Sequence, residues 1–427
     1  MKYSILTLGC KVNQFETQAM ERFLRNRGHV PAEKGEADVV IVNSCAVTAE
    51  SGRKSRQALR RLMAENPHAV GAICGCYSQV EPKDSEALGA AVIYGSGDRE
   101  KFVEAVERAV DGKTAERCVD DPFLRKEFER LPAGALEGRT RAYLKIEDGC
   151  DNFCAYCVIP FARGRVRSMP LADIREEAAR LQREGYRELI LTGIEISSYG
   201  KDLRDGSGLA DAVCSAAEGA PETRLRIGSM EPTIITPDFC AALKNAGNVC
   251  RHFHLSLQSG CDRTLAAMRR KYDTARFRES AAMLRDAFPG CALTADLITG
   301  FPGETDADFS QTLDFIREIG FAEMHIFPYS IRPGTRAAEM PGQLTHAVKN
   351  ARAAEAQAAA DRMQNDYLDA QLGKTLSVLF ETEQDARWNG HSDNYCEVLA
   401  EGENLHGIIK NVQISAREGK KIVGNIV

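Results

Sequence analysis

The chain has 427 residues, 44% hydrophobic and 27% charged, and this length predicts about three globular domains. Its net charge of −6 excludes a uniformly basic nucleic-acid-binding chain, so any RNA contact must be local. No apolar run approaches the roughly 20 residues of a membrane span, so we expect a cytoplasmic protein with no membrane partner. Fourteen cysteines without an export signal indicate a reducing compartment, where clustered cysteines are more often metal ligands than disulfides.

Apolar runs alternate with helical patterns over residues 1–112. The runs YSILTLG, ADVVIVNS and AVGAIC predict strands, and the stretches between and after them predict helices. This alternation is typical of βαβ units in an α/β domain with a parallel sheet. Residues 113–138 are polar and lack a sustained apolar period, so we expect a linker there.

Six more strand–helix units are predicted over residues 139–368. The expected strands are AYLKI, ELILTG, LRIGS, HFHLSLQ, LTADLITG and EMHIFPYS. Six such units favour a partial TIM-like (β/α)6 barrel, with its reactive face at the C-terminal ends of the strands. Over residues 369–427 the apolar runs are short and broken by Gly, Asn and Asp, which predicts a small all-β barrel domain.

Three closely spaced cysteines, Cys150, Cys154 and Cys157, lie in the segment EDGCDNFCAYCVIP. A 4Fe-4S cluster has four irons, so three thiolates leave one iron open to bind an amine and a carboxylate, which S-adenosylmethionine carries. The alternative is a zinc site, which needs a fourth Cys or His nearby, and the next histidine is His252. The spacing therefore favours a 4Fe-4S cluster.

A second trio, Cys10, Cys45 and Cys76, is dispersed along the first domain. Each cysteine lies just past the end of a predicted parallel strand, and such ends face one crevice in an open α/β sheet. We expect the three thiolates to converge on a second 4Fe-4S cluster with an open iron. Cys74 is an alternative to Cys76 as the third ligand, but we assign it to the strand interior.

Seven motifs follow one another along nearly the whole chain: TLGCKVNQFET, NSCAVT, GCYSQ, DGCDNFCAYCVIPFARGRVRS, LTGIEISSYGKDL, HFHLSLQSGCDRTLAAMRRKY and DLITGFPGET. Together they resemble the methylthiotransferase family of radical S-adenosylmethionine enzymes. The resemblance implies an N-terminal domain with an auxiliary cluster (1–112), a linker (113–138), a radical domain (139–368) and a TRAM-like β domain that contacts RNA (369–427).

Within that family, LGCKVNQFET is most similar to the branch that methylthiolates C2 of N6-threonylcarbamoyladenosine in tRNA, next to the anticodon. The isopentenyladenosine branch would show Gln-Met-Asn after the cysteine, and the branch that modifies a ribosomal-protein aspartate would show Pro-Lys-Asn. Both remain alternative substrates. The alternative outside enzymes is an RNA-binding protein whose cysteines hold structural zinc.

The resemblance also implies cofactors, partners and further site residues. The cofactors are two 4Fe-4S clusters and S-adenosylmethionine, the source of both the radical and the methyl group, and the partners are tRNA, an electron donor and a sulfur source. The residues expected to contact S-adenosylmethionine are Tyr156, Gly193, Glu195, Ser229, Glu231, Gln258 and Gly300. Ile194 interrupts the Gly-Gly-Glu pattern usual in radical enzymes, so a solvated loop carboxylate is the alternative for Glu195. Loop packing or hydrogen bonding is the alternative for Tyr156, Ser229, Glu231 and Gln258.

A tRNA partner requires Lys and Arg side chains for its phosphates. In the last domain Asp and Glu outnumber Lys and Arg, so we expect the main contacts elsewhere. Arg163, Arg165 and Arg167 follow the cluster loop in RGRVRS and are the first candidates. A second basic segment, GRKSRQALRR, is more simply explained as a solvated helix face.

Overall fold

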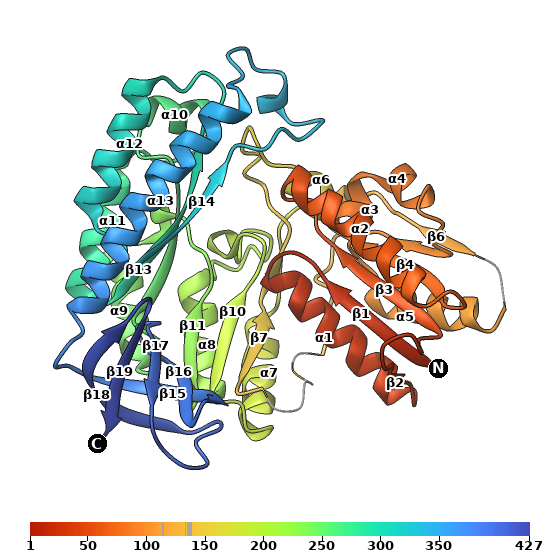
Figure 1. Ribbon diagram of the computed structural model, residues 1–427, viewed down its shortest axis with the longest axis horizontal. Helices are drawn as coiled ribbons and strands as arrows, with labels where there is room; N and C mark the ends of the chain where they lie inside the picture. Colours follow the sequence, from red (N-terminus) through yellow and green to blue (C-terminus); the bar gives the residue numbers. More distant parts are fainter. Residues whose placement is uncertain (113–114, 133, 135–138) are drawn as a thin grey trace.

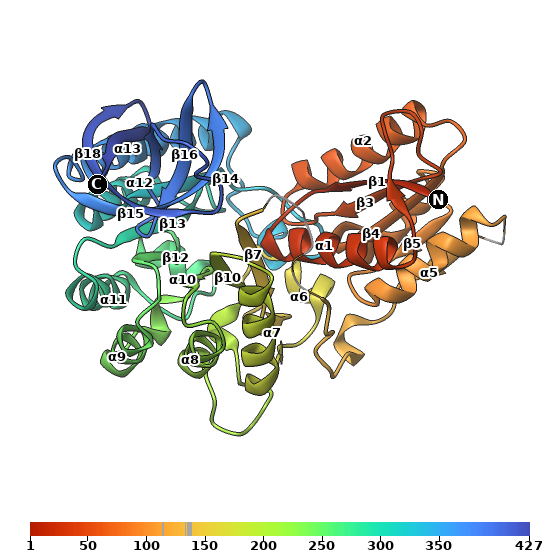
Figure 2. The same ribbon diagram turned by 90° about the horizontal axis from the view of Figure 1, so that it is seen from below.

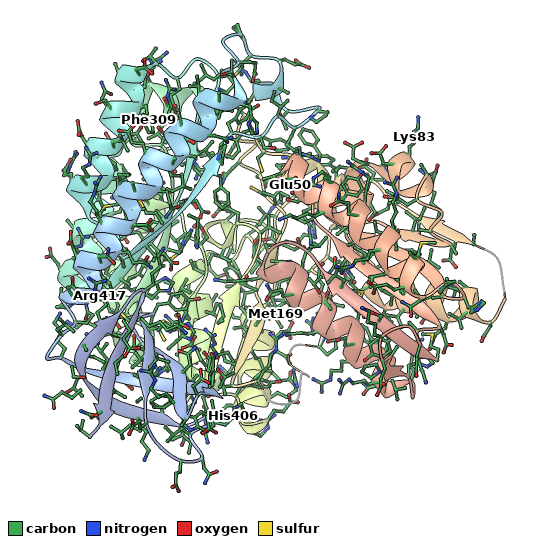
Figure 3. All side chains as sticks on the ribbon, viewed as in Figure 1. Glu50, Lys83, Met169, Phe309, His406 and Arg417 are labelled. Carbon is green, nitrogen blue, oxygen red and sulfur yellow. The ribbon has the colours of Figure 1, made fainter. Side chains whose placement is uncertain are left out.

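The computed structural model describes residues 1–112, 115–132, 134 and 139–427. An N-terminal α/β unit lies beside a central barrel of strands and helices, and a small β-barrel packs against one end of the central unit (Figure 1). Side chains fill the spaces between the ribbons in all three units (Figure 3). In the described part of the chain, no helix combines the length and the apolar character needed to cross a membrane.

The N-terminal unit is built on a 6-stranded parallel sheet in the order β2-β1-β3-β4-β5-β6. Its strands are β1 (Lys2–Thr7), β2 (Val30–Pro31), β3 (Val39–Ser44), β4 (Val70–Gly75), β5 (Val92–Tyr94) and β6 (Glu116–Cys118). Its helices are α1 (Lys11–Asn26), α2 (Ala49–Glu65), α3 (Cys76–Val80), α4 (Pro82–Glu86) and α5 (Arg99–Val110).

The two faces of this sheet carry separate apolar cores, because successive side chains of a strand point to opposite faces. On one face, Ala72 and Cys74 of β4 pack with residues of α1 and α5. On the other face, Ile73 packs with residues of α2 and α3. The sheet is thus covered by helices on both sides, as expected for a parallel sheet (Figure 2).

The sheet extends past the domain boundary expected at residue 112. Strand β6 pairs with β5, and the 3-10 helix η1 (Pro122–Leu124) follows it. Arg125 then ties this segment back to the unit by donating hydrogen bonds to Ser96 Oγ at 2.8 Å and to Gln79 Oε1 at 2.9 Å. Residues 113–114, 133 and 135–138 of the expected linker lie outside the described residues.

The central unit confirms the expected partial barrel. Its strands are β7 (Arg141–Lys145), β10 (Glu188–Thr192), β11 (Arg224–Ile227), β12 (His252–Gln258), β13 (Ala292–Thr299) and β14 (Glu323–Pro328). They form two parallel sheets, β7-β10-β11 and β12-β13-β14, which isolated bridges at Leu225–Val249 and Met230–Leu255 join. Strands β7 and β14 are the two edges of this open barrel.

Helices form an arc outside the strands of the central unit (Figure 2). They are α7 (Leu171–Arg183), α8 (Leu209–Gly219), α9 (Pro237–Ala246), α11 (Thr274–Ala287), α12 (Asp306–Ile319) and α13 (His346–Asp369). Shorter elements are α6 (Ile159–Arg163), α10 (Asp262–Ala267), β8 (Glu147–Asp148), β9 (Arg167–Ser168), η2 (Ile196–Ser198), η3 (Pro232–Ile234) and η4 (Arg336–Ala338). Thr236, Asp273, Thr305 and Thr345 cap α9, α11, α12 and α13 by accepting a backbone N–H.

The C-terminal unit is a closed barrel in the order β15-β16-β17-β19-β18. Its strands are β15 (Thr375–Gln384), β16 (Arg387–Ser392), β17 (Glu397–Ala400), β18 (Ile409–Glu418) and β19 (Lys421–Ile426). Arg417, which is labelled in Figure 3, pairs with Asp369 at the end of α13, with Nε and Oδ1 2.5 Å apart. Tyr395 stacks on His252 of β12 with ring centroids 4.5 Å apart, which fixes the small barrel against the central one.

Candidate active site

The first cysteine trio lies on a loop that turns tightly between β8 and α6. Gly149 has φ +91° there, and a Cβ at that position would lie 1.9 Å from the carbonyl oxygen of Arg165, so only glycine fits. The Cys157 N–H donates to the Cys154 carbonyl at 3.0 Å, and the Asn152 N–H donates to Cys150 Sγ at 3.5 Å. These bonds hold the three thiols around one loop.

The second trio converges as the strand ends predict. Cys10 is the N-cap of α1, Cys45 follows β3, and Cys76 begins α3. Burial raises the pKa of each thiol, and the thiols are close enough to raise one another's pKa further. Gly75 turns β4 into α3 with φ +105°, and a Cβ there would lie 2.5 Å from the Ser44 carbonyl oxygen.

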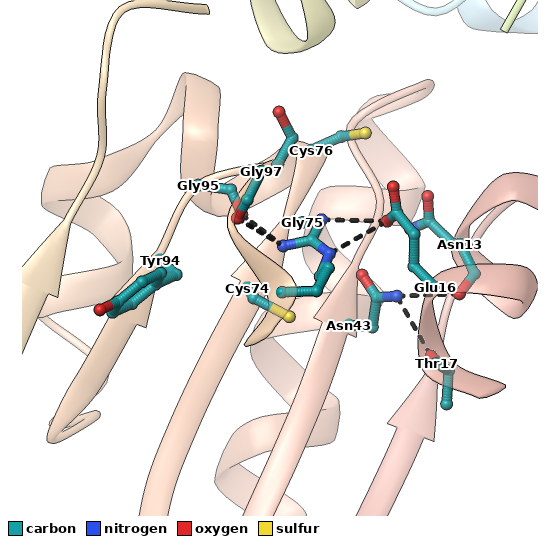
Figure 4. A network of polar contacts seen from close by, with 12 residues as sticks. Asn13, Glu16, Thr17, Asn43, Cys74, Gly75, Cys76, Tyr94, Gly95 and Gly97 are labelled. Atoms are coloured by element: carbon teal, nitrogen blue, oxygen red, sulfur yellow. Dashed lines mark hydrogen bonds and ion pairs between the residues drawn. The ribbon is translucent and has the colours of Figure 1, made fainter. Parts of the chain in front are cut away.

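Cys74 and Cys76 lie on opposite sides of the sheet in the N-terminal unit, at the C-terminal end of β4 (Figure 4). The Cys74 sulfur lies 3.9 Å from the Met20 sulfur within the apolar core under α1. The Cys76 sulfur instead accepts a hydrogen bond from Arg163 Nε at 3.2 Å. This placement supports Cys76 as the third ligand, which stays a prediction.

The sulfurs of neither trio are as close together as the ligand atoms of one bound metal ion. In the described residues, the only His, Cys, Asp or Glu group whose ligand atoms all lie within 4.8 Å of one another is His254, Asp296 and His325. Neither cysteine trio is that compact, whereas sulfurs bound to one Zn²⁺ at about 2.3 Å each must lie close together. All fourteen cysteines are free of disulfides. A cluster with separate irons suits this arrangement.

The two trios face each other across the interface between the N-terminal and central units. Burial and then the neighbouring Cys154 raise the pKa of Cys157 to about 12, and Cys76 of the other trio adds to this effect. Arg163 lies between them with no solvent exposure of its side chain. Besides Cys76, its guanidinium contacts Asn13 Oδ1 at 3.0 Å and Glu16.

For two of the three arginines, the structure does not agree with the predicted role in RNA binding. Arg163 is fully buried, and Arg167 is 4% exposed and donates to the backbone oxygens of Arg165 and Arg163 at 2.7 and 3.1 Å. Neither guanidinium is accessible to a phosphate. Arg165 differs, because its side chain is 59% exposed and contacts Asp151 at 3.1 Å and the ring of Phe153. Its role in RNA binding stays a prediction.

Glu195 and Glu231 come together beside the first cysteine trio. The side-chain amide of Asn152 donates to both carboxylates, at 3.3 Å and 3.1 Å. Burial, and then the charge of Glu231, raises the pKa of Glu195 to about 7. Glu195 is half-buried, and its contact with S-adenosylmethionine stays a prediction.

Arg270 completes this group and was not singled out from the sequence. Its Nη2 donates to Glu231 at 2.7 Å, and its Nη1 lies 3.0 Å from the Cys154 sulfur. Its side chain is 5% exposed. The motif AAMRRKY contains it, but spacing alone does not distinguish Arg270 from the exposed Arg269. Two carboxylates, an amide and a guanidinium thus surround the open side of the cluster loop, where they can hold an amine and a carboxylate.

Glu147 is a second residue that the sequence did not reveal. It is fully buried, and its Oε2 accepts the Glu195 N–H at 2.8 Å, while its Oε1 has no hydrogen-bond partner among the described residues. Burial raises the pKa of Glu147 well above its usual value. A Cβ at Gly193 would lie 2.6 Å from Glu147 Oε2, which explains the glycine there by close packing.

The remaining predicted contacts lie on the cluster loop and at the C-terminal ends of the barrel strands. Tyr156 packs edge-on against Phe301 with centroids 6.5 Å apart, and Ser229 Oγ lies 3.0 Å from Ser256 Oγ. Gln258 ends β12 with φ +67°. Gly300 has φ +72°, and its missing Cβ would lie 2.5 Å from Lys349 on α13, so helix packing explains this glycine. Contact of these residues with S-adenosylmethionine stays a prediction.

Comparisons with known proteins agree with this geometry. Residues 144–316 match the radical SAM superfamily, and residues 2–94 match the uncharacterized protein family UPF0004. The chain is 37% identical over 418 residues to the threonylcarbamoyladenosine tRNA methylthiotransferase MtaB of Bacillus subtilis, which covers 96% of this chain and 92% of that protein. It is also 37% identical over 378 residues to MtaB of Thermotoga maritima, covering 88% and 86%.

The chain is also similar to a second kind of tRNA-modifying enzyme and to a solved structure. It is 33% identical over 392 residues to the tRNA-2-methylthio-N(6)-dimethylallyladenosine synthase of Pelotomaculum thermopropionicum, covering 90% of this chain and 87% of that protein. Among solved structures, the radical S-adenosylmethionine methyltransferase TsrM of Kitasatospora setae shares the fold, with a TM-score of 0.58, 16% identity and coverage of 79% and 77%. The chain therefore belongs to the methylthiotransferase family of radical S-adenosylmethionine enzymes.

Proposed function

We propose that the protein replaces the hydrogen at C2 of N6-threonylcarbamoyladenosine, next to the anticodon of tRNA, with a methylthio group. The observation that carries the proposal is the convergence of two separate cysteine trios on one buried interface, since the reaction needs both a radical source and a sulfur donor. The higher identity to two MtaB proteins than to the dimethylallyladenosine synthase favours this adenosine over isopentenyladenosine.

The cofactors are two 4Fe-4S clusters and S-adenosylmethionine. One cluster would be held by Cys150, Cys154 and Cys157. The other would be held by Cys10, Cys45 and Cys76. When bound, these groups supply a radical by reductive cleavage of S-adenosylmethionine, together with the sulfur and methyl group that enter the product. The reaction also consumes electrons and sulfur, which an electron donor and an external sulfur source must supply.

The side chains around the clusters bind and orient. Arg270 neutralises Glu231 and approaches the Cys154 sulfur, and Asn152 holds Glu195 and Glu231 together. Glu195 is poised to accept a hydrogen bond from the amino group of S-adenosylmethionine, because its pKa of about 7 leaves a substantial ionised fraction at neutral pH. Arg163 excludes water between the two cysteine trios and donates to the Cys76 sulfur.

Contact with tRNA is assigned to the exposed Arg165 and to the C-terminal barrel as a TRAM-like domain. Arg165 lies directly after the first cysteine trio, so a phosphate bound there would bring the anticodon loop to the site. A tRNA substrate also implies a location in the cytoplasm.

Nucleoside mass spectrometry tests the proposal. Cluster-loaded protein is incubated anaerobically with S-adenosylmethionine, sulfide, a reductant and tRNA that carries threonylcarbamoyladenosine, and the tRNA is then digested. We expect a methylthio adduct on that nucleoside, and none with the variants Cys157→Ala or Cys76→Ala. An adduct only on isopentenyladenosine would overturn the substrate. No adduct on any tRNA, with both clusters verified, would favour a protein substrate.

A further inference from the structure

A cavity of about 470 Å³ opens inside the central barrel, between strands β12–β14 and the C-terminal unit. A second cavity of about 280 Å³ lies toward β7 and β10, and both are lined by Lys11 and Tyr395. Lys11 belongs to the N-terminal unit, as the first residue of α1 and the neighbour of Cys10. All three units therefore contribute to one hollow region next to the second cysteine trio.

Lys11 differs from three other cations that line these cavities, Arg226, Arg141 and Lys420. Arg226 is paired with Glu188 at 2.8 Å, Arg141 with Glu381 at 2.8 Å, and Lys420 with Asp361 at 2.9 Å; each of these charges is compensated. Lys11 has no hydrogen bond or ion pair with any described residue. It stays accessible to solvent within the cavity, so an anion that enters can reach it.

A group of polar side chains faces the same cavity from the barrel wall. Asp296 Oδ1 lies 3.1 Å from His325 Nδ1, and Asp296 Oδ2 lies 3.4 Å from His254 Nε2. The hydroxyl of Thr294 lies 2.9 Å from His254 Nδ1, which fixes that ring. His325 is the exposed member, with 52% of its side chain accessible, and its Nε2 has no partner among the described residues.

We propose that Lys11 and His325 bind the carboxylate of the threonyl group, and so select an adenosine with an anionic side chain over one with an apolar side chain. This inference rests on the proposed function and names the residues that make its substrate choice. Asp296 holds His325 at Nδ1, which leaves its Nε2 to donate to the incoming carboxylate in the imidazolium form. The same cavity is also lined by Glu323 and by Glu397, which is paired with Lys421 at 2.7 Å, so the Lys11 ammonium and the His325 imidazolium are the groups that can donate to a carboxylate.

The dimensions of the barrel agree with this assignment. His254 lies four residues before Gln258, where β12 ends at the cluster face, and four residues of strand span about 13 Å. The modified purine would place its C2 at the cluster face and extend its N6 substituent into the barrel. The distance from C2 to the end of that substituent is of this order. The apolar isopentenyl group would instead leave the Lys11 charge uncompensated in the cavity.

The test compares two RNA hairpins that differ only in charge. One is an anticodon stem–loop with threonylcarbamoyladenosine, and the other carries its methyl ester, which has nearly the same shape but no carboxylate. Binding to the cluster-loaded protein is measured by fluorescence anisotropy. We expect the wild type to bind the free acid about 10- to 100-fold more tightly than the ester, as for a hydrogen bond between charged groups.

Variants of the protein show which side chains produce the preference for the free acid over the ester. Lys11→Gln and His325→Gln should lose most of it, and Lys11→Arg should keep it. The matched control is Lys420→Gln, because Lys420 lines the same cavity but is already paired with Asp361, and this variant should behave as the wild type. Iron content is measured for each variant, since Lys11 adjoins Cys10. The KM for modified tRNA should rise in Lys11→Gln with kcat less affected.

Three results of the binding and metal measurements would overturn the inference. One is equal binding of acid and ester by the wild type, and another is a preference that survives in Lys11→Gln. The third is a stoichiometric divalent cation, found by elemental analysis of the wild type and lost in His325→Gln, because His254, Asp296 and His325 are also a plausible ligand set for a cation. A wild type that methylthiolates both acid and ester hairpins equally would refute only this inference, whereas one that methylthiolates neither would refute the proposed function.

Discussion

Arg163, at the end of α6, and Glu16, on α1, form an ion pair from which solvent is fully excluded. The pair joins the central unit to the N-terminal unit, and Arg99 approaches the same carboxylate at 2.9 Å from the other side. Burial by itself raises the pKa of Glu16, but the charges of Arg163 and Arg99 outweigh it and lower the pKa to about 2. Two buried arginines thus depend on one carboxylate.

Replacement of this carboxylate should destabilise the protein. We expect Glu16→Ala to cost about 3–5 kcal/mol, because it leaves the buried Arg99 without its ion pair and leaves Arg163 with only the more distant Asp148, at 3.4 Å. Urea unfolding of the anaerobically purified protein measures this cost. Glu50→Ala is the control, since Glu50 pairs with Arg53 on the surface with about half of each side chain exposed, and it should cost less than about 1 kcal/mol. Equal unfolding midpoints for the two variants would contradict the structural role of Glu16.

The assignment of the third auxiliary ligand can be measured by iron content. Cys76→Ser should reduce the iron from about eight to about four atoms per chain, because only the cluster of the first trio remains. Cys74→Ser should keep about eight, since its thiol packs in the core against Met20. Loss of iron in Cys74→Ser with retention in Cys76→Ser would reverse the assignment.

Arg270 should matter for S-adenosylmethionine binding. Arg270→Met removes the charge that neutralises Glu231 and the contact with the Cys154 sulfur, and we expect the affinity to fall about 10- to 100-fold. Equilibrium dialysis with the cluster-loaded protein measures the dissociation constant. The neighbouring Arg269 is exposed, so Arg269→Met is a matched control that should bind normally. Equal losses in both variants would show that Arg270 has no specific role.

Contact of Arg165 with tRNA predicts a change in salt dependence. If Arg165 binds one phosphate, Arg165→Ala should reduce the slope of log K against log salt concentration by about 1. Binding of unmodified tRNA at several salt concentrations measures this slope. Arg167→Ala should instead lower stability, because its guanidinium is buried and bonded to backbone oxygens. An unchanged slope in Arg165→Ala would exclude it from the RNA interface.

The contact with Asp296 should raise the pKa of His325. The hydrogen bond that the imidazolium donates to Asp296 stabilises the charged ring, so it raises the pKa of His325 above the ordinary 6.5. His325 therefore stays protonated to higher pH than an isolated histidine, and Asp296→Asn should lower its midpoint. NMR of the His ring protons in the cluster-free protein measures this, with His325→Gln for assignment. A midpoint at or below 6.5 in the wild type would contradict the pairing.

Most of the fold could be predicted from hydrophobic patterning. The strands of the central barrel are buried on both sides or at their outer face, so each appears as a continuous or alternating apolar run. Strand β16 has no such run, because RWNGHS has Trp388 as its only large apolar residue, and pairing with β15 and β17 holds it. Strands β2, β5 and β6 are two or three residues long, which is too short for a period to be visible.

The candidate site could be predicted only where backbone topology determines it. Cys10, Cys45 and Cys76 could be grouped from sequence, because parallel strands end at one edge. The burial of Arg163 and Arg167 could not, because a basic motif gives the charge of a residue and not its surroundings. Arg270 meets Glu231 and Cys154 only through tertiary packing, over separations of 39 and 116 residues, and no local spacing predicts such a contact.

The most direct test of the central claim is a competition between two tRNAs in one anaerobic reaction. One carries threonylcarbamoyladenosine and the other isopentenyladenosine, both with deuterium at C2 of the modified adenine. We expect mass spectrometry to find the methylthio group on threonylcarbamoyladenosine alone, and each product molecule to have lost its C2 deuterium. A methylthio product that keeps the deuterium, or one formed mainly on isopentenyladenosine, would contradict this expectation.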